Sequence, residues 1–113
     1  MKIINITKNA ILADNATLAQ TILTRLKGLI FKIELKKGQA LIIKPCNSIH
    51  TFFMRFKIDV LFVSSENKVI KIYKGMKPFR VTSVYLKSAF VIEFPSGIAT
   101  ATNTEESDQL SIG

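Results

Sequence analysis

The 113-residue sequence contains one cysteine, one histidine and three prolines. The single cysteine, Cys46, excludes an internal disulfide framework. One cysteine and one histidine do not supply the ligand sets of structural metal sites, so we expect no metal and no cofactor. No nucleophile elbow, phosphate-binding loop or paired metal motif is present. No apolar run approaches the roughly 18 residues of a membrane-spanning helix, so no such helix is predicted.

Acidic residues are also scarce in the middle of the chain. Between Gln20 and Phe90 there are fourteen lysines and arginines against three acids, a local charge of +11 within a net charge of +8. A basic body can attract nucleic acid or anionic lipid. However, thirteen of the sixteen cations are lysines, and no basic helix face with interleaved aromatic residues or known nucleic-acid motif is present. We therefore expect no nucleic-acid partner.

The length and the apolar content of 48% are those of one folded domain, so we expect residues 1–113 to form a single domain. The acidic stretch at residues 104–109 is the segment that we expect to be mobile. The first five residues turn polar too soon for a secretory signal, which favours a cytoplasmic location. The domain is small and basic, and its partner is expected to be an unidentified small ligand or protein, with the oligomeric state open.

One α-helix is predicted near the N-terminus. Thr17 and Gln20 have the spacing of a capping box. Leucine and isoleucine side chains then recur at helical spacing up to Leu29, and Lys27-Gly28 is a typical helix end. We expect this apolar stripe to pack in the core.

The rest of the chain is predicted to be strands separated by turns. Residues 74–87 are predicted to be a loop. The fold class is therefore mainly β, a β-sandwich or open barrel with one N-terminal helix. The expected strands begin with Ile3, Ile4 and Ile6 and continue over Ala10–Ala13, Gln39–Lys44, His50–Met54, Ile58–Val63, Val69–Tyr73, Ala89–Phe94 and Gln109–Ile112.

Cys46 and His50 are a candidate thiolate–imidazolium pair. Along one straight strand, two residues four apart lie roughly 13 Å from each other, so a hydrogen bond between them needs a turn at residues 47–48. A free cysteine is commonly a small buried apolar residue. We therefore predict that Cys46 is not a potent nucleophile. His50 itself is expected to be a core or near-core histidine.

Two carboxylates interrupt apolar strands. Asp59 divides the run from Phe56 to Val63, so it needs backbone N–H donors, a cation such as Arg80 or Arg55, or water. Glu93, in the run from Phe90 to Phe94, is either a solvent-facing residue or the second acid of a polar pocket. A structural ion pair of Asp59 is the simpler interpretation.

Five stretches of the sequence follow one another between residues 16 and 97: Arg25 to Ile30, Ser48 to Met54, Ile58 to Phe62, Lys77 to Arg80 and Ile92 to Gly97. Together they resemble the domain of unknown function 192 family. Ile30 and Lys57 depart from the family pattern, where Met and Pro are frequent, and Ser107 replaces a closing glycine.

The resemblance implies a compact β-rich fold from a bacterial or archaeal source, and no particular activity. Many relatives look exported or membrane-linked. We expect a non-enzymatic binding or accessory module with a shallow polar pocket and no catalytic residue. The alternatives are a small enzyme that uses Asp59 and Glu93 or Cys46 and His50, and a protein-interaction component of an envelope or secretion assembly. The candidate pocket residues are His50, Met54, Asp59, Arg80 and Glu93.

Overall fold

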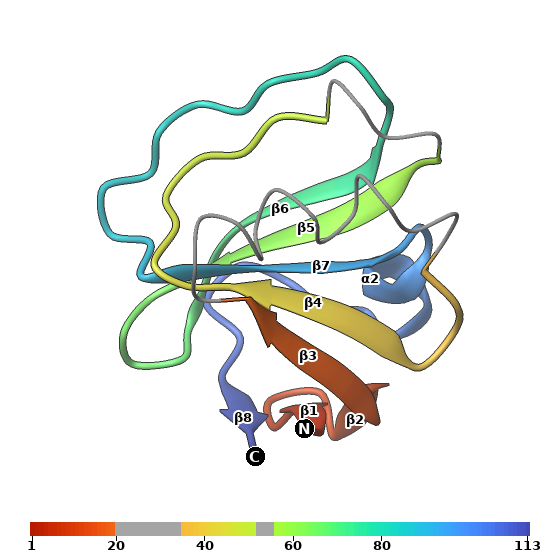
Figure 1. The fold of residues 1–113 in the computed structure, drawn as a ribbon. Coiled ribbons are helices and arrows are strands. Elements are labelled where there is room, and N and C mark those ends of the chain that lie inside the picture. The colour runs from red at the N-terminus through yellow and green to blue at the C-terminus, as the bar shows by residue number, and fades with distance from the viewer. Residues whose placement is uncertain (20–34, 52–55) are drawn as a thin grey trace.

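The computed structural model describes residues 1–19, 35–51 and 56–113. Their strands form two sheets (Figure 1). The three-stranded sheet has the order β2-β1-β8, and the five-stranded sheet has the order β3-β4-β7-β5-β6. The strands are β1 Ile3–Asn5, β2 Ala10–Ala13, β3 Asn15–Ala19, β4 Gln39–Ile43, β5 Ile58–Val63, β6 Val69–Met76, β7 Phe90–Pro95 and β8 Leu110–Ile112. The expected mainly β class is confirmed, as two sheets and not as a closed barrel.

The predicted N-terminal helix is wrong at its start. Thr17 lies in β3, which pairs in parallel with β4 from Asn15 opposite Gln39 to Ala19 opposite Ile43. Residues 20–28, the rest of that prediction, lie outside the described residues. The one helix in the described part of the chain is α2, Ile98–Ala101, near the C-terminus. Pairing with a distant strand outweighs the local helical spacing, because intrinsic propensity is weak and tertiary pairing overrides it.

Both faces of the five-stranded sheet are buried. On one face, the apolar side chains of Leu61, Ile92 and Phe94 pack against those of the three-stranded sheet, such as Ile3 and Leu110. The other face carries a second apolar cluster that includes Val60, Phe62 and Val91. This double burial explains why β5 is apolar at nearly every position instead of alternating.

A polar turn joins β5 and β6 into a hairpin, and its Asn67 takes a left-handed conformation with φ 63°. β6 continues to Met76, three residues beyond the predicted strand. Near its end, Asp59 of β5 stands opposite two residues, Lys74 and Gly75, because the register shifts between Ile58 and Val60. The hairpin thus contains a β-bulge beside the buried carboxylate.

A buried polar cluster joins the chain ends. The Asn5 amide donates to the Thr104 hydroxyl at 3.0 Å and to the Asp108 carboxylate at 2.9 Å, and Lys8 lies 3.3 Å from the same carboxylate. Burial alone would raise the pKa of Asp108, but these hydrogen bonds, one from the Glu105 backbone and the Lys8 charge lower it overall. Mobility of residues 104–109 stays a prediction, which hydrogen exchange would test.

Candidate binding site

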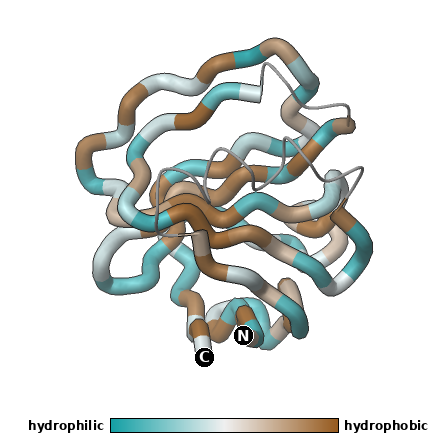
Figure 2. Tube along the Cα trace, viewed as in Figure 1, coloured by the Kyte–Doolittle hydropathy of each residue, from teal (hydrophilic) through white to brown (hydrophobic). Residues whose placement is uncertain are grey.

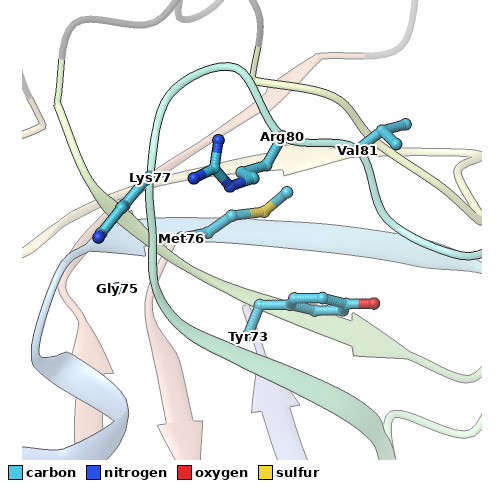
Figure 3. Close-up of a pocket in the computed structure, with 6 residues that line it drawn as sticks. All are labelled: Tyr73, Gly75, Met76, Lys77, Arg80 and Val81. Atoms are coloured by element: carbon cyan, nitrogen blue, oxygen red, sulfur yellow. The ribbon is translucent and has the colours of Figure 1, made fainter.

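A pocket of about 360 Å³ lies where β6 ends and the following loop begins (Figure 3). The Arg80 side chain extends over Met76, and Tyr73 lies along the same side of the strand. Neither Arg80 nor Lys77 forms an ion pair with any residue that the structure describes. The pocket therefore combines apolar walls with positive charge that no carboxylate of the described residues neutralises. Its lining residues are Tyr73, Gly75, Met76, Lys77, Arg80 and Val81.

Thr51 holds the loop that carries Arg80. Its hydroxyl donates to the Lys77 carbonyl at 2.7 Å and accepts from the Arg80 backbone N–H at 2.9 Å. Its backbone N–H donates to the Arg80 carbonyl at 2.8 Å, and its carbonyl accepts from the Phe79 N–H at 2.9 Å. Thr51 is fully buried, so these bonds are shielded from water and fix the tight turn from Lys77 to Arg80.

Asp59 lies beneath the pocket, and its carboxylate is fully engaged. One oxygen accepts from the Gly75 N–H at 2.8 Å; the other accepts from Gly97 at 3.1 Å and Ala99 at 2.8 Å. Asp59 therefore joins the pocket floor at Gly75 to the first turn of α2. The expected backbone donors are present, and Asp59 bonds neither Arg80 nor His50 among these contacts.

Glu93 occupies the opposite face of the sheet from Asp59. It pairs with Val60 and Leu41, whose side chains belong to the second apolar cluster, whereas Asp59 pairs with Phe94 of the first. The two carboxylates therefore do not face one common pocket. Glu93 is 3% exposed, and one of its carboxylate oxygens has no hydrogen-bond partner among the described residues. Burial raises the pKa of Glu93 to about 8.

Two further predicted residues lie near or outside the pocket. His50 was expected to be a core or near-core histidine, but this is wrong: it is exposed and forms an isolated bridge with Val81, a pocket residue. Met54 lies outside the described residues. Of the predicted set, Arg80 lines the pocket, His50 adjoins it, and Asp59 supports its floor. The use of these residues in ligand binding stays a prediction.

A tyrosine pair adjoins the pocket and has no obvious sequence signal. The Tyr73 and Tyr85 hydroxyls lie 2.6 Å apart, and both rings pack against Phe62. The hydrogen bond with Tyr73 and, to a lesser extent, burial raise the pKa of Tyr85. The pair fastens the loop around residue 85 to β6. The sequence around Tyr85 contains no motif that marks this residue. Its role depends on the contact with Tyr73, which only the structure shows.

Cys46 is buried, and its thiol donates to the Ser48 carbonyl at 3.1 Å. Burial restricts access of an electrophile to the sulfur. We expect the folded protein to react with iodoacetamide at pH 6 no faster than a free cysteine does. Mass spectrometry of the intact protein over time measures this rate. Alkylation far faster than that of the free thiol would contradict the prediction and favour the enzyme alternative.

The described part of the chain contains neither a metal-binding cluster nor a membrane-spanning helix. No group of three or more histidine, cysteine, aspartate or glutamate side chains is placed to hold a metal ion there. No helix in that part is long and apolar enough to cross a membrane.

Residues 3–112 match the model of the DUF192 family, described as uncharacterized ACR, and the chain belongs to this family. A UPF0127 protein from Pyrococcus horikoshii is 32% identical, with 96% of each chain covered. A crystal structure of a protein of unknown function from Novosphingobium aromaticivorans has a TM-score of 0.80 at 18% identity, covering 98% of this chain and 82% of that one.

A second crystal structure shares the fold. It comes from Sinorhizobium meliloti 1021 and carries the provisional description of a transcription regulator. Its TM-score is 0.81 at 16% identity, covering 97% of this chain and 89% of that one. Both structural likenesses show the fold alone. The family is thus one of β-rich domains of unknown function, as the five sequence stretches predicted.

Proposed function

We propose that this chain is a non-enzymatic binding module, one domain over residues 1–113, whose pocket takes a small anion with an apolar part. The observation that carries the proposal is the guanidinium of Arg80 at a pocket without a carboxylate among its lining residues. A guanidinium in such a setting favours a carboxylate or phosphate, which it can bind through two parallel hydrogen bonds. Lys77 adds positive charge at the same rim.

The apolar walls supply the second part of the recognition. Tyr73, Met76 and Val81 line the pocket beside the cations. Pockets for small ligands typically combine apolar walls with a few polar groups that fix orientation. Thr51 and Asp59 hold the pocket's loop and floor through backbone bonds, so the site is largely formed before a ligand enters. Preformed sites lose less entropy on binding.

Replacing Arg80 with alanine is expected to weaken binding of a small carboxylate or phosphate about tenfold or more, because a charge-assisted hydrogen bond is lost. A thermal-shift screen of aromatic and aliphatic carboxylates and phosphate esters identifies a ligand, and calorimetry measures its Kd. Lys2→Ala is the matched control, since it removes one exposed charge beside the three-stranded sheet. If no anion of the screen shifts the melting temperature, or if Arg80→Ala binds like the parent, the proposal is wrong.

A cytoplasmic location and the absence of a nucleic-acid partner remain part of the proposal. The one cysteine is buried, so the fold does not depend on an oxidising compartment. Proteins bind the phosphate backbone of nucleic acids through cationic and polar groups. The exposed apolar side chains around this pocket do not serve that purpose. Cell fractionation with an antibody against the chain tests the location.

A further inference from the structure

Two loops run side by side and form an arm, which we define as residues 46–51 and 77–88. Backbone bonds join them: the Thr82 N–H donates to the Ile49 carbonyl at 3.0 Å, and the Tyr85 N–H donates to the Asn47 carbonyl at 2.9 Å. The arm extends past the end of the five-stranded sheet, on the side away from the three-stranded sheet (Figure 1). The arm is therefore held in place by bonds between its two halves, by the Tyr85 ring packed on Phe62, and by the Ser88 hydroxyl, which donates to the Phe90 carbonyl of β7.

The arm exposes large apolar side chains to solvent. Leu86 is 88% exposed, Phe79 69%, Val81 67% and Val84 59%. Brown, apolar segments alternate with teal, polar ones along this part of the chain (Figure 2). A single exposed apolar residue needs no explanation, but four on one short projection indicate an interaction surface. Phe79 also has φ 61°, an uncommon conformation for a bulky residue, and Thr51 stabilises the turn that imposes it.

The same arm carries positive charge and no negative charge. Arg80 lies between Phe79 and Val81, Lys77 precedes the exposed apolar run and Lys87 follows it, and neither half of the arm contains an acid. The whole segment from residue 67 to residue 92 holds six lysines and arginines without an aspartate or glutamate. The occupant of this surface must therefore offer negative charge together with an apolar environment.

We propose that the arm docks on the surface of an anionic lipid bilayer. Leu86, Val84 and Phe79 would enter the boundary between headgroups and acyl chains, while Lys87 and Arg80 contact lipid phosphates. Shallow insertion of apolar side chains beside cations is the physical basis of peripheral membrane binding. This inference goes beyond the proposed function, because Leu86, Val84 and Lys87 do not line the pocket.

A lipid surface fits the arm better than an acidic protein. The cores of protein interfaces gather apolar groups at the centre and charges at the rim. Here cations and apolar side chains are interleaved, and Leu86 stands almost clear of its own fold. A bilayer accommodates such a mixture, because its headgroup phosphates lie directly above its hydrocarbon. The cations of the arm would contact the phosphates while the apolar side chains beside them contact the hydrocarbon.

Flotation of the purified chain with vesicles tests the proposal. Vesicles of mixed phosphatidylglycerol and phosphatidylcholine are expected to bind the chain, with less binding at high salt, and vesicles of phosphatidylcholine alone are expected to leave it in solution. Leu86→Ser and Lys87→Ala are each expected to lower the partition coefficient about fivefold or more. Ile6→Ser, at a 55% exposed isoleucine on the other sheet's side, and Lys2→Ala are the matched controls and should bind like the parent.

Two results would overturn the proposal: no binding to anionic vesicles, or equal binding by Leu86→Ser and the parent. All of these substitutions are at exposed positions, so the variants should fold, and circular dichroism checks this. The small-ligand test separates this inference from the proposed function. Leu86→Ser should keep the parent's affinity for a soluble anion in the pocket, so either proposal can fail without the other.

Discussion

Replacing Asp59 with alanine is expected to lower the free energy of unfolding by about 3–5 kcal/mol, because three backbone N–H donors lose a charged acceptor. Asp59 is fully buried, so water cannot replace the carboxylate without opening the sheet. Urea unfolding followed by circular dichroism gives the change. Asp59→Asn keeps one oxygen acceptor and should fall between the parent and Asp59→Ala.

The matched control for Asp59 is Glu66→Ala, which removes an exposed carboxylate from the turn of the same hairpin. Its effect should stay within about 0.5 kcal/mol of zero. Should Asp59→Ala unfold at the same urea concentration as Glu66→Ala, the three bonds would not contribute to stability as described.

The largest pH effect is expected from Glu93. Burial raises its pKa from 4.5 to about 8 in the folded protein, so the folded chain keeps a proton that the unfolded chain releases. The stabilisation is complete below pH 4.5 and is lost as the pH rises to about 8. A shift of this size corresponds to at most about 5 kcal/mol, and relaxation of the buried site reduces it, so we expect about 2–4 kcal/mol.

Glu93→Gln tests this expectation, because it has nearly the same shape and does not titrate. Unfolding free energies of parent and variant should diverge steadily as the pH rises from 5 to 8, with the variant more stable at the alkaline end. Glu66→Gln, an exposed control, should follow the parent. The difference between parent and Glu93→Gln also removes the contribution of Asp108, whose lowered pKa acts in the opposite direction at acidic pH. A constant difference across this range would contradict the raised pKa.

Most strands of the fold could be predicted because their signals are local. β3 was missed, and of the strand expected at His50–Met54 the described residues show only an isolated bridge at His50. The run from Ile58 to Val63 is bounded by polar residues and coincides with β5. The helix prediction at Thr17 failed because the deciding interaction, parallel pairing of β3 with β4, joins residues 24 positions apart, such as Thr17 and Leu41. Burial of both sheet faces also removes the alternation that would have distinguished the faces of β5.

The candidate site was only partly predictable, for the same reason. Arg80 was recognisable as an arginine in a polar loop, and a buried carboxylate at Asp59 was expected to find donors. The role of Thr51 was not recognisable, because its partners lie 26 and 29 residues away. The orientation of Glu93, away from Asp59, depends on the register of β7 between β4 and β5, which no local pattern specifies.

The pairing of β1 with both β2 and β8 has a consequence for the order of folding. Lys2 and Gly113 exchange two backbone hydrogen bonds, at 2.8 and 3.0 Å, across the whole length of the chain. One edge of β1 therefore stays without its partner during synthesis until residues 110–112 have left the ribosome. Closing a loop of this length is slow relative to forming a hairpin. The three-stranded sheet is thus the part of the protein that we expect to assemble last, on a five-stranded sheet that already presents one face of the core.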